Sequence, residues 1–347
     1  MTVVIPTFGR EEILLETVGL VLALAPGELL VVDQTPKHDE ATEARLAAWD
    51  REGAIRWIRL DAPSIPRAMN TGLVEAGARP KAASDAAAGS AGVPPASSEG
   101  GQDARAPGRL HPSQALPREA GDGIVLFLDD DIIPCPELLD AHRRAHDAHP
   151  DADAVVGQIL QPGESPAPVG GDFHFFSDSP QWISAAMAGN MSVKRARAVA
   201  AGGFDENFVG AAYMFETEFA RRLARSGGKI FFEPSASIRH LRANRGGTRF
   251  HGTHFRTVTP AHSSGAYYNM FLESGIPGSA ARVVRRLASS VATRHHMRNP
   301  WWIPATLVAE IRGLAQALAL YHKGPRLLGA RASCPLSEEA GGRLTVR

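Results

Sequence analysis

The stretch "GDGIVLFLDDDIIPCPELL", residues 121–139, joins an apolar run to three consecutive carboxylates. The run 124–128 reads as a buried strand, and Asp129, Asp130 and Asp131 follow it directly. Like charges this close repel one another, and each is costly to bury without positive charge nearby. Carboxylates at positions i and i+2 after a strand can share a divalent cation through their oxygens, which makes the repulsion tolerable. An acidic turn that caps the next helix is the alternative explanation.

Short apolar runs alternate with helical patterns along most of the chain. Before residue 79 the predicted strands are 2–6, 28–35 and 55–60, and the predicted helices are 10–24, 40–53 and 66–76. After the carboxylates, helices are predicted at 135–150 and 214–225, and strands at 153–160 and 229–234. This alternation predicts an α/β fold with a doubly wound, mostly parallel sheet flanked by helices.

Ligands of such sheets collect at the carboxyl ends of the strands. Asp33 ends the second predicted strand, and the three aspartates end the strand 124–128. We therefore expect these carboxylates on one rim, beside the loop from Thr7 to Arg10.

Residues 79–122 interrupt the pattern with Ala, Gly, Pro and Ser and contain no aromatic residue. Such a segment cannot bury enough apolar surface to offset its ordering entropy, so we predict a disordered insertion within one domain.

Composition excludes several classes of protein. The chain carries 37 Lys and Arg against 37 Asp and Glu, so no global field recruits nucleic acid. Two cysteines exclude a disulfide scaffold and fit a reducing compartment. We expect no secretory signal and no ordinary membrane-spanning helix, and hence a cytoplasmic protein.

Six blocks of the sequence carry a resemblance to a known family. They are "VVIPTFGR", "LLVVDQT", "PSIPRAMNTGL", "IVLFLDDDI", "GNMSVKRARAVAAGGFDENF" and "FETEFARRLARSGGKIFFEPSASIRH". In this order the chain resembles glycosyltransferase family 2 over roughly residues 2–242. The resemblance implies a GT-A catalytic domain, here 1–255, a nucleotide-diphospho-sugar donor, Mg²⁺ or Mn²⁺, and inversion at the anomeric carbon.

The resemblance also implies roles for individual residues. Asp129 and Asp131 match the metal-binding DxD motif, and His240 is a candidate to complete the metal shell. The residues implied in donor binding are Pro6, Thr7, Arg10, Asp33, Arg67, Asn70, Asp129 and Asp130. The acceptor-side residues are Asn190, Phe204, Asp205 and Glu206. A helix N-cap remains an alternative role for Asp33, as does a surface ion pair for Arg67.

Glu216 is the predicted catalytic base. It matches the second acid of the family's "ED" pair, although here Phe215 replaces the first acid. The base must take a proton from the acceptor hydroxyl as that oxygen attacks. Glu218 is the backup, and either glutamate could instead be a first-turn acid favoured by the helix dipole.

Four arginines lie around Gly246 and Gly247, the first of them at the end of the last matched block. They are Arg239, Arg242, Arg245 and Arg249. They suggest a flexible loop that closes on the diphosphate, with a solvated basic loop as the alternative.

Residues 256–347 form a predicted helical, basic extension outside the resemblance. Residues 278–331 hold nine basic residues and one acid, Glu310, together with Trp301 and Trp302. This composition is typical of a membrane-surface element, here at the inner face of the cell membrane. A helix packed on the catalytic domain explains it equally well.

These observations predict a metal-dependent inverting glycosyltransferase of bacterial-type polysaccharide or glycoconjugate synthesis, acting on a saccharide, lipid-linked or other hydroxyl acceptor. Two alternatives stay open. A nucleotidyltransferase would use a similar metal site but usually opens with a Gly-rich basic loop, which "IPTFGREE" lacks. A non-catalytic sugar-binding protein would keep the fold without the base.

Overall fold

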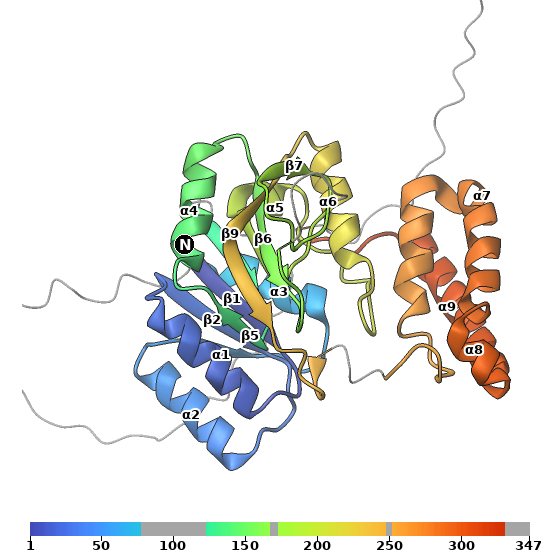
Figure 1. The fold of residues 1–347 in the computed structure, drawn as a ribbon, viewed down its shortest axis with the longest axis horizontal. Helices are drawn as coiled ribbons and strands as arrows, with labels where there is room; N and C mark the ends of the chain where they lie inside the picture. Colours follow the sequence, from blue (N-terminus) through green and yellow to red (C-terminus); the bar gives the residue numbers. More distant parts are fainter. Residues whose placement is uncertain (78–122, 167–172, 248–251, 330–347) are drawn as a thin grey trace, which may run out of the picture.

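The computed structural model describes residues 1–77, 123–166, 173–247 and 252–329. The predicted insertion 79–122, Arg249 and the last residues of the extension, 330–347, lie outside the described residues. Figure 1 shows a sheet covered by helices, with a separate group of helices beside it.

The N-terminal part follows the predicted alternation. Its elements are β1 Thr2–Thr7, α1 Glu12–Ala23, β2 Glu28–Asp33, α2 Glu40–Arg51, β3 Arg56–Arg59 and α3 Ile65–Glu75. Strand β1 pairs in parallel with β2, and β2 pairs in parallel with β3. Ser64 caps α3 by accepting from the backbone N–H of Arg67, and a proline follows in the first turn of the helix.

The rest of the sheet mixes directions. Its elements are β4 Ile124–Leu128, β5 Ile132–Pro134, α4 Leu138–Ala148, β6 Ala154–Leu160, β7 Gln181–Ile183, β8 Asn190–Lys194, α5 Arg195–Ala200, α6 Phe215–Arg225 and β9 Ile230–His240. The strand order is β3-β2-β1-β4-β8-β6-β9-β5, and β7 also pairs with β9. Strands β1–β4, β6 and β9 run one way, whereas β5, β7 and β8 run against them. The prediction of a mostly parallel α/β sheet is confirmed.

Alternate side chains of the strands build two cores, one on each face of the sheet. On one face Val4, Val32 and Phe127 pack against α3, α5 and α6. On the other, Ile5 and Leu126 pack against α1, α2 and α4. This two-sided cover is the doubly wound arrangement that the sequence predicts (Figure 1).

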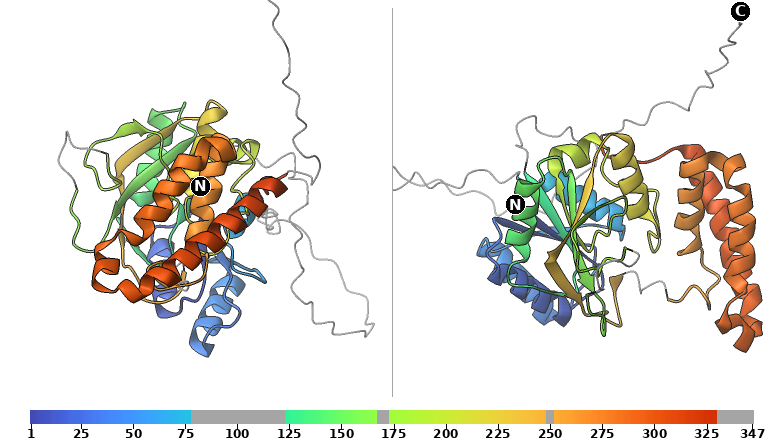
Figure 2. Two further views of the ribbon diagram at one scale, coloured as in Figure 1. Left: turned by 90° about the vertical axis from the view of Figure 1, so that its right-hand side faces the viewer. Right: turned by 45° about the horizontal axis from the view of Figure 1, so that its top comes forward.

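The C-terminal extension is helical, as expected. It consists of α7 Ser263–Val291, α8 Arg294–Arg298, the short 3-10 helix η2 Pro300–Trp302, and α9 Ile303–Lys323. Helix α7 is kinked at Gly275, where φ is 67°, with Pro277 just after. Figure 1 and the right view of Figure 2 show these helices beside the rest of the fold.

One helix in the described part of the chain, Pro300–Lys323, is long and apolar enough to cross a membrane, by length and composition only. The sequence analysis predicts no ordinary spanning helix, partly because Glu310 lies within the stretch Pro300–Lys323. Glu310 is buried against α7 in an ion pair with Arg286, at 3.0 Å. Length and apolar composition alone are weak evidence for a membrane span. This helix, α9, also forms a buried ion pair with α7.

Candidate active site

A cleft of about 400 Å³ opens at the carboxyl ends of β1 and β4. Eight of the residues singled out from the sequence line it: Pro6, Thr7, Arg10, Asp129, Asp130, Asp131, Glu216 and His240. Its opposite wall is the segment 211–217, which leads into α6. The cleft therefore lies at the strand ends, where the sequence predicts the ligand to bind.

Asp129, Asp131 and His240 form a cluster of possible metal ligands. One donor atom from each lies within 4.8 Å of the others. The Nε2 atom of His240 is 3.2 Å from Oδ1 of Asp131 and 3.4 Å from Oδ2 of Asp129. The antiparallel pairing of β5 with β9 sets Ile132 opposite His240, which brings the histidine to the aspartates.

The surroundings of this cluster fit a divalent cation. Two carboxylates and an imidazole are ordinary ligands of such ions. A Cβ atom at Gly189 would lie 2.3 Å from Oδ2 of Asp129, so only glycine leaves room for that carboxylate. Asp131 is buried, and its Oδ2 also accepts from the backbone N–H of Ala243 at 2.7 Å. The backbone of Ala243 thus fixes the Asp131 carboxylate, and Gly189 leaves room for that of Asp129.

Asp130 points into the protein, although it also borders the cleft. Its Oδ2 accepts from the Thr7 hydroxyl at 2.7 Å, and its Oδ1 lies 3.3 Å from Nε of Arg10. Burial raises the pKa of Asp130 to about 7, and the Arg10 charge partly opposes that rise. The middle carboxylate thus ties the first loop to the end of β4.

Arg10 is buried at the centre of these contacts. Besides Asp130 it lies 3.4 Å from Oδ2 of Asp131, and it donates to the backbone carbonyl of Arg245. The backbone of Gly246 and Gly247 crosses the first loop so closely that a Cβ at Gly246, where φ is +76°, would meet the Gly9 carbonyl at 2.3 Å. Arg10 therefore offsets the carboxylate charge and anchors the segment that follows β9.

Glu216 lies in the first turn of α6 and is half-buried in the cleft wall. Its Oε1 accepts from the backbone N–H of Ala188 at 2.7 Å. Burial raises the pKa of Glu216 to about 7, and the charge of Asp129 adds to the rise. A carboxyl with a pKa near neutral pH has the acidity that a general base needs.

Glu218 occupies a different environment. It is buried, and both of its oxygens pair with Arg222, at 2.9 and 2.6 Å. It is not among the described residues that line the cleft. The structure thus separates the two glutamates, one in the cleft and one in an ion pair on the helix.

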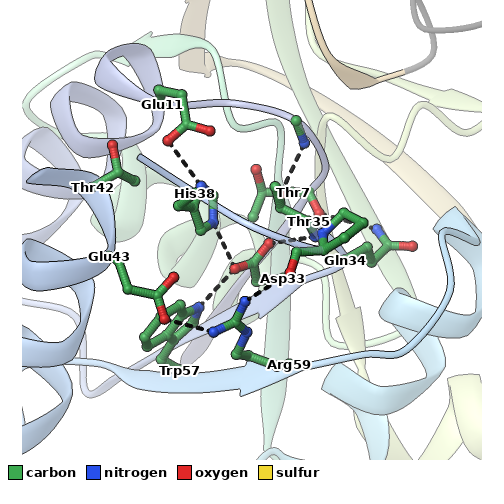
Figure 3. A network of polar contacts seen from close by, with 12 residues as sticks. Thr7, Glu11, Asp33, Gln34, Thr35, His38, Thr42, Glu43, Trp57 and Arg59 are labelled. Carbon is green, nitrogen blue, oxygen red and sulfur yellow. Dashed lines mark hydrogen bonds and ion pairs between the residues drawn. The ribbon is translucent and has the colours of Figure 1, made fainter. Parts of the chain in front are cut away.

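Asp33 lies on the predicted rim, level with Thr7 in the pairing of β1 with β2. Its side chain, however, is fully buried in the network of Figure 3. Oδ1 accepts from the backbone N–H of Thr35 at 2.8 Å, and Oδ2 contacts His38 Nε2 at 2.8 Å and Trp57 Nε1 at 2.9 Å. Burial opposes ionisation, yet these hydrogen bonds hold the pKa of Asp33 below its ordinary value.

His38 is buried between two carboxylates, with Glu11 Oε2 3.0 Å from its Nδ1 (Figure 3). Burial alone would lower the pKa of His38, but Asp33 and Glu11 together raise it. The neighbour of Asp33, Gln34, is the residue that lines the cleft, and its backbone N–H donates to the Thr7 carbonyl at 2.9 Å.

Arg67 and Asn70 are outside the residues that line the cleft in the described part of the chain. Arg67 forms an ion pair with exposed Asp61 at 2.6 Å, which is the alternative that the sequence left open. The buried amide of Asn70 exchanges hydrogen bonds with the backbone of Phe204, each 2.8 Å long. It therefore joins α3 to the "GGFDENF" turn.

The predicted acceptor-side residues are also placed away from the cleft lining. Phe204 is fully buried and contacts the ring of Phe127 edge-on. Asn190 is buried, and its Nδ2 donates to the carbonyls of Gln158 and Ala236. Asn190 thus links β8 to β6 and β9, and Phe204 packs between β4 and α6.

Asp205 and Glu206 face the C-terminal extension. Asp205 is fully buried, accepts from the Tyr268 hydroxyl at 2.7 Å, and accepts from the backbone N–H of Arg326 at 2.9 Å. Burial raises the pKa of Asp205. Glu206 pairs with the Arg326 guanidinium at 3.1 Å and with the amide of Asn70 at 3.1 Å. This turn is therefore the attachment point of the extension.

Comparisons with known proteins report on the fold. No protein-family profile matches the chain, and no curated protein matches its sequence. Among solved structures, S. aureus TarS 1-349 in complex with UDP-GlcNAc is 14% identical, with a TM-score of 0.51 over 88% of this chain and 78% of that one. The same TarS fragment in complex with UDP is 14% identical, with a TM-score of 0.50 over 92% and 86%.

The chain has the fold of these glycosyltransferases. Longer proteins also match: GalNAc-T7 with UDP, GalNAc and Mn²⁺ is 13% identical, with a TM-score of 0.48 over 69% of this chain. The chain spans only 43% of the GalNAc-T7 chain and 38% of a longer S. aureus TarS chain.

Proposed function

We propose that this chain is a metal-dependent glycosyltransferase that moves a sugar, with inversion, from a nucleotide-diphospho-sugar to an acceptor hydroxyl. The observation that carries the proposal is one cleft that combines a metal-type cluster with a half-buried carboxyl of raised pKa, that of Glu216. These are the two groups that such a transfer requires.

The cluster of Asp129, Asp131 and His240 would hold a divalent cation. When bound there, Mg²⁺ or Mn²⁺ would supply positive charge to stabilise the departing diphosphate. Arg242 and Arg245 are exposed in the segment that follows His240 and would add positive charge near the cluster. They are suited to the outer oxygens of a diphosphate, because Arg10 is occupied by the aspartates.

Glu216 would act on the acceptor. Its ionised carboxylate takes the proton of the acceptor hydroxyl as that oxygen forms a bond to C1 of the sugar, and the bond from C1 to the diphosphate breaks. The hydrogen bond from Ala188 fixes Oε1, which leaves Oε2 for the proton. Attack and departure on opposite faces of C1 give inversion.

Donor and acceptor classes follow as part of the proposal. The TarS structures hold UDP-GlcNAc and UDP, so UDP-sugars are the first donors to test. The acceptor is a saccharide, a lipid-linked sugar or another hydroxyl compound of bacterial-type polysaccharide or glycoconjugate synthesis, and the protein works in the cytoplasm.

A donor screen tests the function. The full chain with Mn²⁺ and a set of UDP-sugars should show thermal stabilisation by at least one donor, followed by slow release of UDP through hydrolysis. Release of pyrophosphate from UTP and a sugar phosphate would instead identify a nucleotidyltransferase. Donor binding without UDP release, with every acceptor class supplied, would identify a sugar-binding protein.

A further inference from the structure

Helix α9 exposes a row of apolar residues. Its exposed positions recur every three or four residues, which places them on one side of the helix. They are Pro304, Val308, Ile311, Ala315 and Ala319, with Arg312 beside them. Its buried positions are Thr306, Ala309, Glu310, Gly313 and Ala317, so the buried side combines small residues with two polar ones. A surface helix in water normally exposes mainly polar residues.

The second half of α7 repeats this pattern. Its exposed positions include Pro277, Ala281, Val284 and Ala288, again three or four residues apart. Val284 is 66% exposed and Ile311 on α9 is 59% exposed. Both helices of the extension therefore present an apolar stripe that the rest of the described chain does not cover.

The segment between the two helices, residues 292–302, is here called the tip. Met297 is 75% exposed and Trp301 is 67% exposed. Together with Val284 and Ile311 they are the four most exposed large apolar side chains in the described part of the chain. Figures 1 and 2 show α8, which forms part of the tip, at the end of the helical group farthest from the sheet.

The exposed positions of these helices also include cations. Arg285, Arg294, Arg298 and Arg312 are exposed on α7, α8 and α9. The only acid between residues 278 and 329 is Glu310, and it is buried against Arg286. Exposed apolar residues and cations thus occur together with no exposed acid among them.

We propose that the tip and the two apolar stripes form a docking surface for an anionic phospholipid bilayer. Met297 and Trp301 would enter the headgroup region, where tryptophan is favoured, and the arginines would contact lipid phosphates. The helices lie in the plane of the interface rather than across it, because α9 carries a buried ion pair on its other side. In the cell this is the cytoplasmic leaflet.

Charge argues against a second copy of the chain as the occupant. A two-fold dimer through this surface would bring the same arginines of both copies together, and like charges across an interface are costly. Anionic lipid instead complements the charge, with each arginine near the surface adding to the attraction.

Vesicle co-sedimentation of the full chain tests the proposal without reference to glycosyl transfer. We expect binding to vesicles that contain phosphatidylglycerol, weaker binding to phosphatidylcholine alone, and loss of binding as salt rises from about 0.1 M to about 1 M. The double variant Met297→Ser/Trp301→Ser should bind roughly tenfold or more weakly. Arg294→Glu/Arg298→Glu should lose a similar factor on anionic vesicles only.

Trp182→Ser is the matched control, because Trp182 is 46% exposed but lies on β7 of the sheet. It should bind vesicles as the unchanged protein does. Circular dichroism must show that each variant is folded, which the exposure of the substituted side chains favours. Unchanged binding by the Met297→Ser/Trp301→Ser variant, or no binding by the unchanged protein, would overturn the proposal. A dimer that this variant converts to monomer, without vesicle binding, would identify a self-association surface instead.

Discussion

Replacing Glu216 with glutamine should lower activity and raise stability at the same time. Glutamine keeps an oxygen that accepts from the Ala188 N–H, so the local structure should survive. It cannot take a proton, and general-base catalysis typically contributes on the order of 10² to 10⁴ in rate. We therefore expect kcat to fall by about that factor while Mn²⁺ and donor binding change little.

The stability effect follows from the pKa of Glu216, which is raised from 4.5 to about 7. Because the folded protein holds this proton more tightly than the unfolded chain, stability falls as pH rises from about 4.5 to about 7. The difference of about 2.5 pH units corresponds to about 3.4 kcal/mol. Solvent screening of a half-buried side chain reduces the expected effect to about 1 to 2 kcal/mol.

Thermal and urea unfolding at a series of pH values from about 4 to about 9 measure how the free energy of unfolding depends on pH, because proton binding is linked to folding. The glutamine variant should match the unchanged protein at the acid end and exceed it above neutral pH. If the proposed function holds, kcat/KM of the unchanged protein should rise with pH up to about 7 and then level, because the base acts in its ionised form.

Glu218→Gln is the control, since Glu218 pairs with Arg222 and lies outside the cleft lining of the described residues. It should lose stability and keep turnover, the opposite of the Glu216 variant. Near-normal turnover by Glu216→Gln would show that the base is another group. Equal stability of this variant and the unchanged protein at every pH would refute the raised pKa.

Three further substitutions, with Gly19→Ala as a control, probe the metal cluster and the attachment of the extension. Asp131→Asn should weaken Mn²⁺ binding, measured by calorimetry, by more than tenfold, because a buried anionic ligand becomes neutral. Gly189→Ala should lower Mn²⁺ affinity by roughly tenfold, since the new methyl group would overlap a ligand carboxylate. Gly19→Ala is the control, because a Cβ at that position meets nothing within 4 Å, and it should leave the Mn²⁺ affinity unchanged. Tyr268→Phe should reduce the urea-measured free energy of unfolding by about 1 to 3 kcal/mol, because Asp205 loses a buried donor; an unchanged midpoint would contradict that contact.

The strand-end rule made the location of the candidate cleft predictable from sequence. Apolar runs that end in acids indicate the rim, and the structure brings the carboxylates of β4 together with the loop after β1 there. The pairing of β5 with β9, which brings His240 to these carboxylates, was harder to predict from the sequence. Strand β5 has only three residues and a proline, so no alternation of side chains reveals it, and only the family resemblance pointed to that histidine.

Side-chain direction was the part that sequence could not supply. Asp33 lies on the rim but turns inward, because Trp57 offers a donor from a neighbouring strand. The "GGFDENF" turn binds the extension through Tyr268, a partner 63 residues away. Residues 211–215 of the cleft wall show neither a helical nor a strand-like alternation of apolar and polar residues. Two of them, Ala212 and Met214, have positive φ although neither is glycine. Such contacts depend on the tertiary fold rather than on local pattern.

The contacts of Asp205 bear on how this protein can be divided. A shortened chain ending near residue 255 would remove the Tyr268 hydroxyl and the Arg326 backbone N–H together, leaving a carboxylate without two of its hydrogen-bond donors. It would also strip aromatic side chains of α7 from the core that covers one face of the sheet. These contacts tie the extension to the sheet, and a shortened chain that keeps them would have to run through residue 328, whose backbone N–H donates to the Gly202 carbonyl.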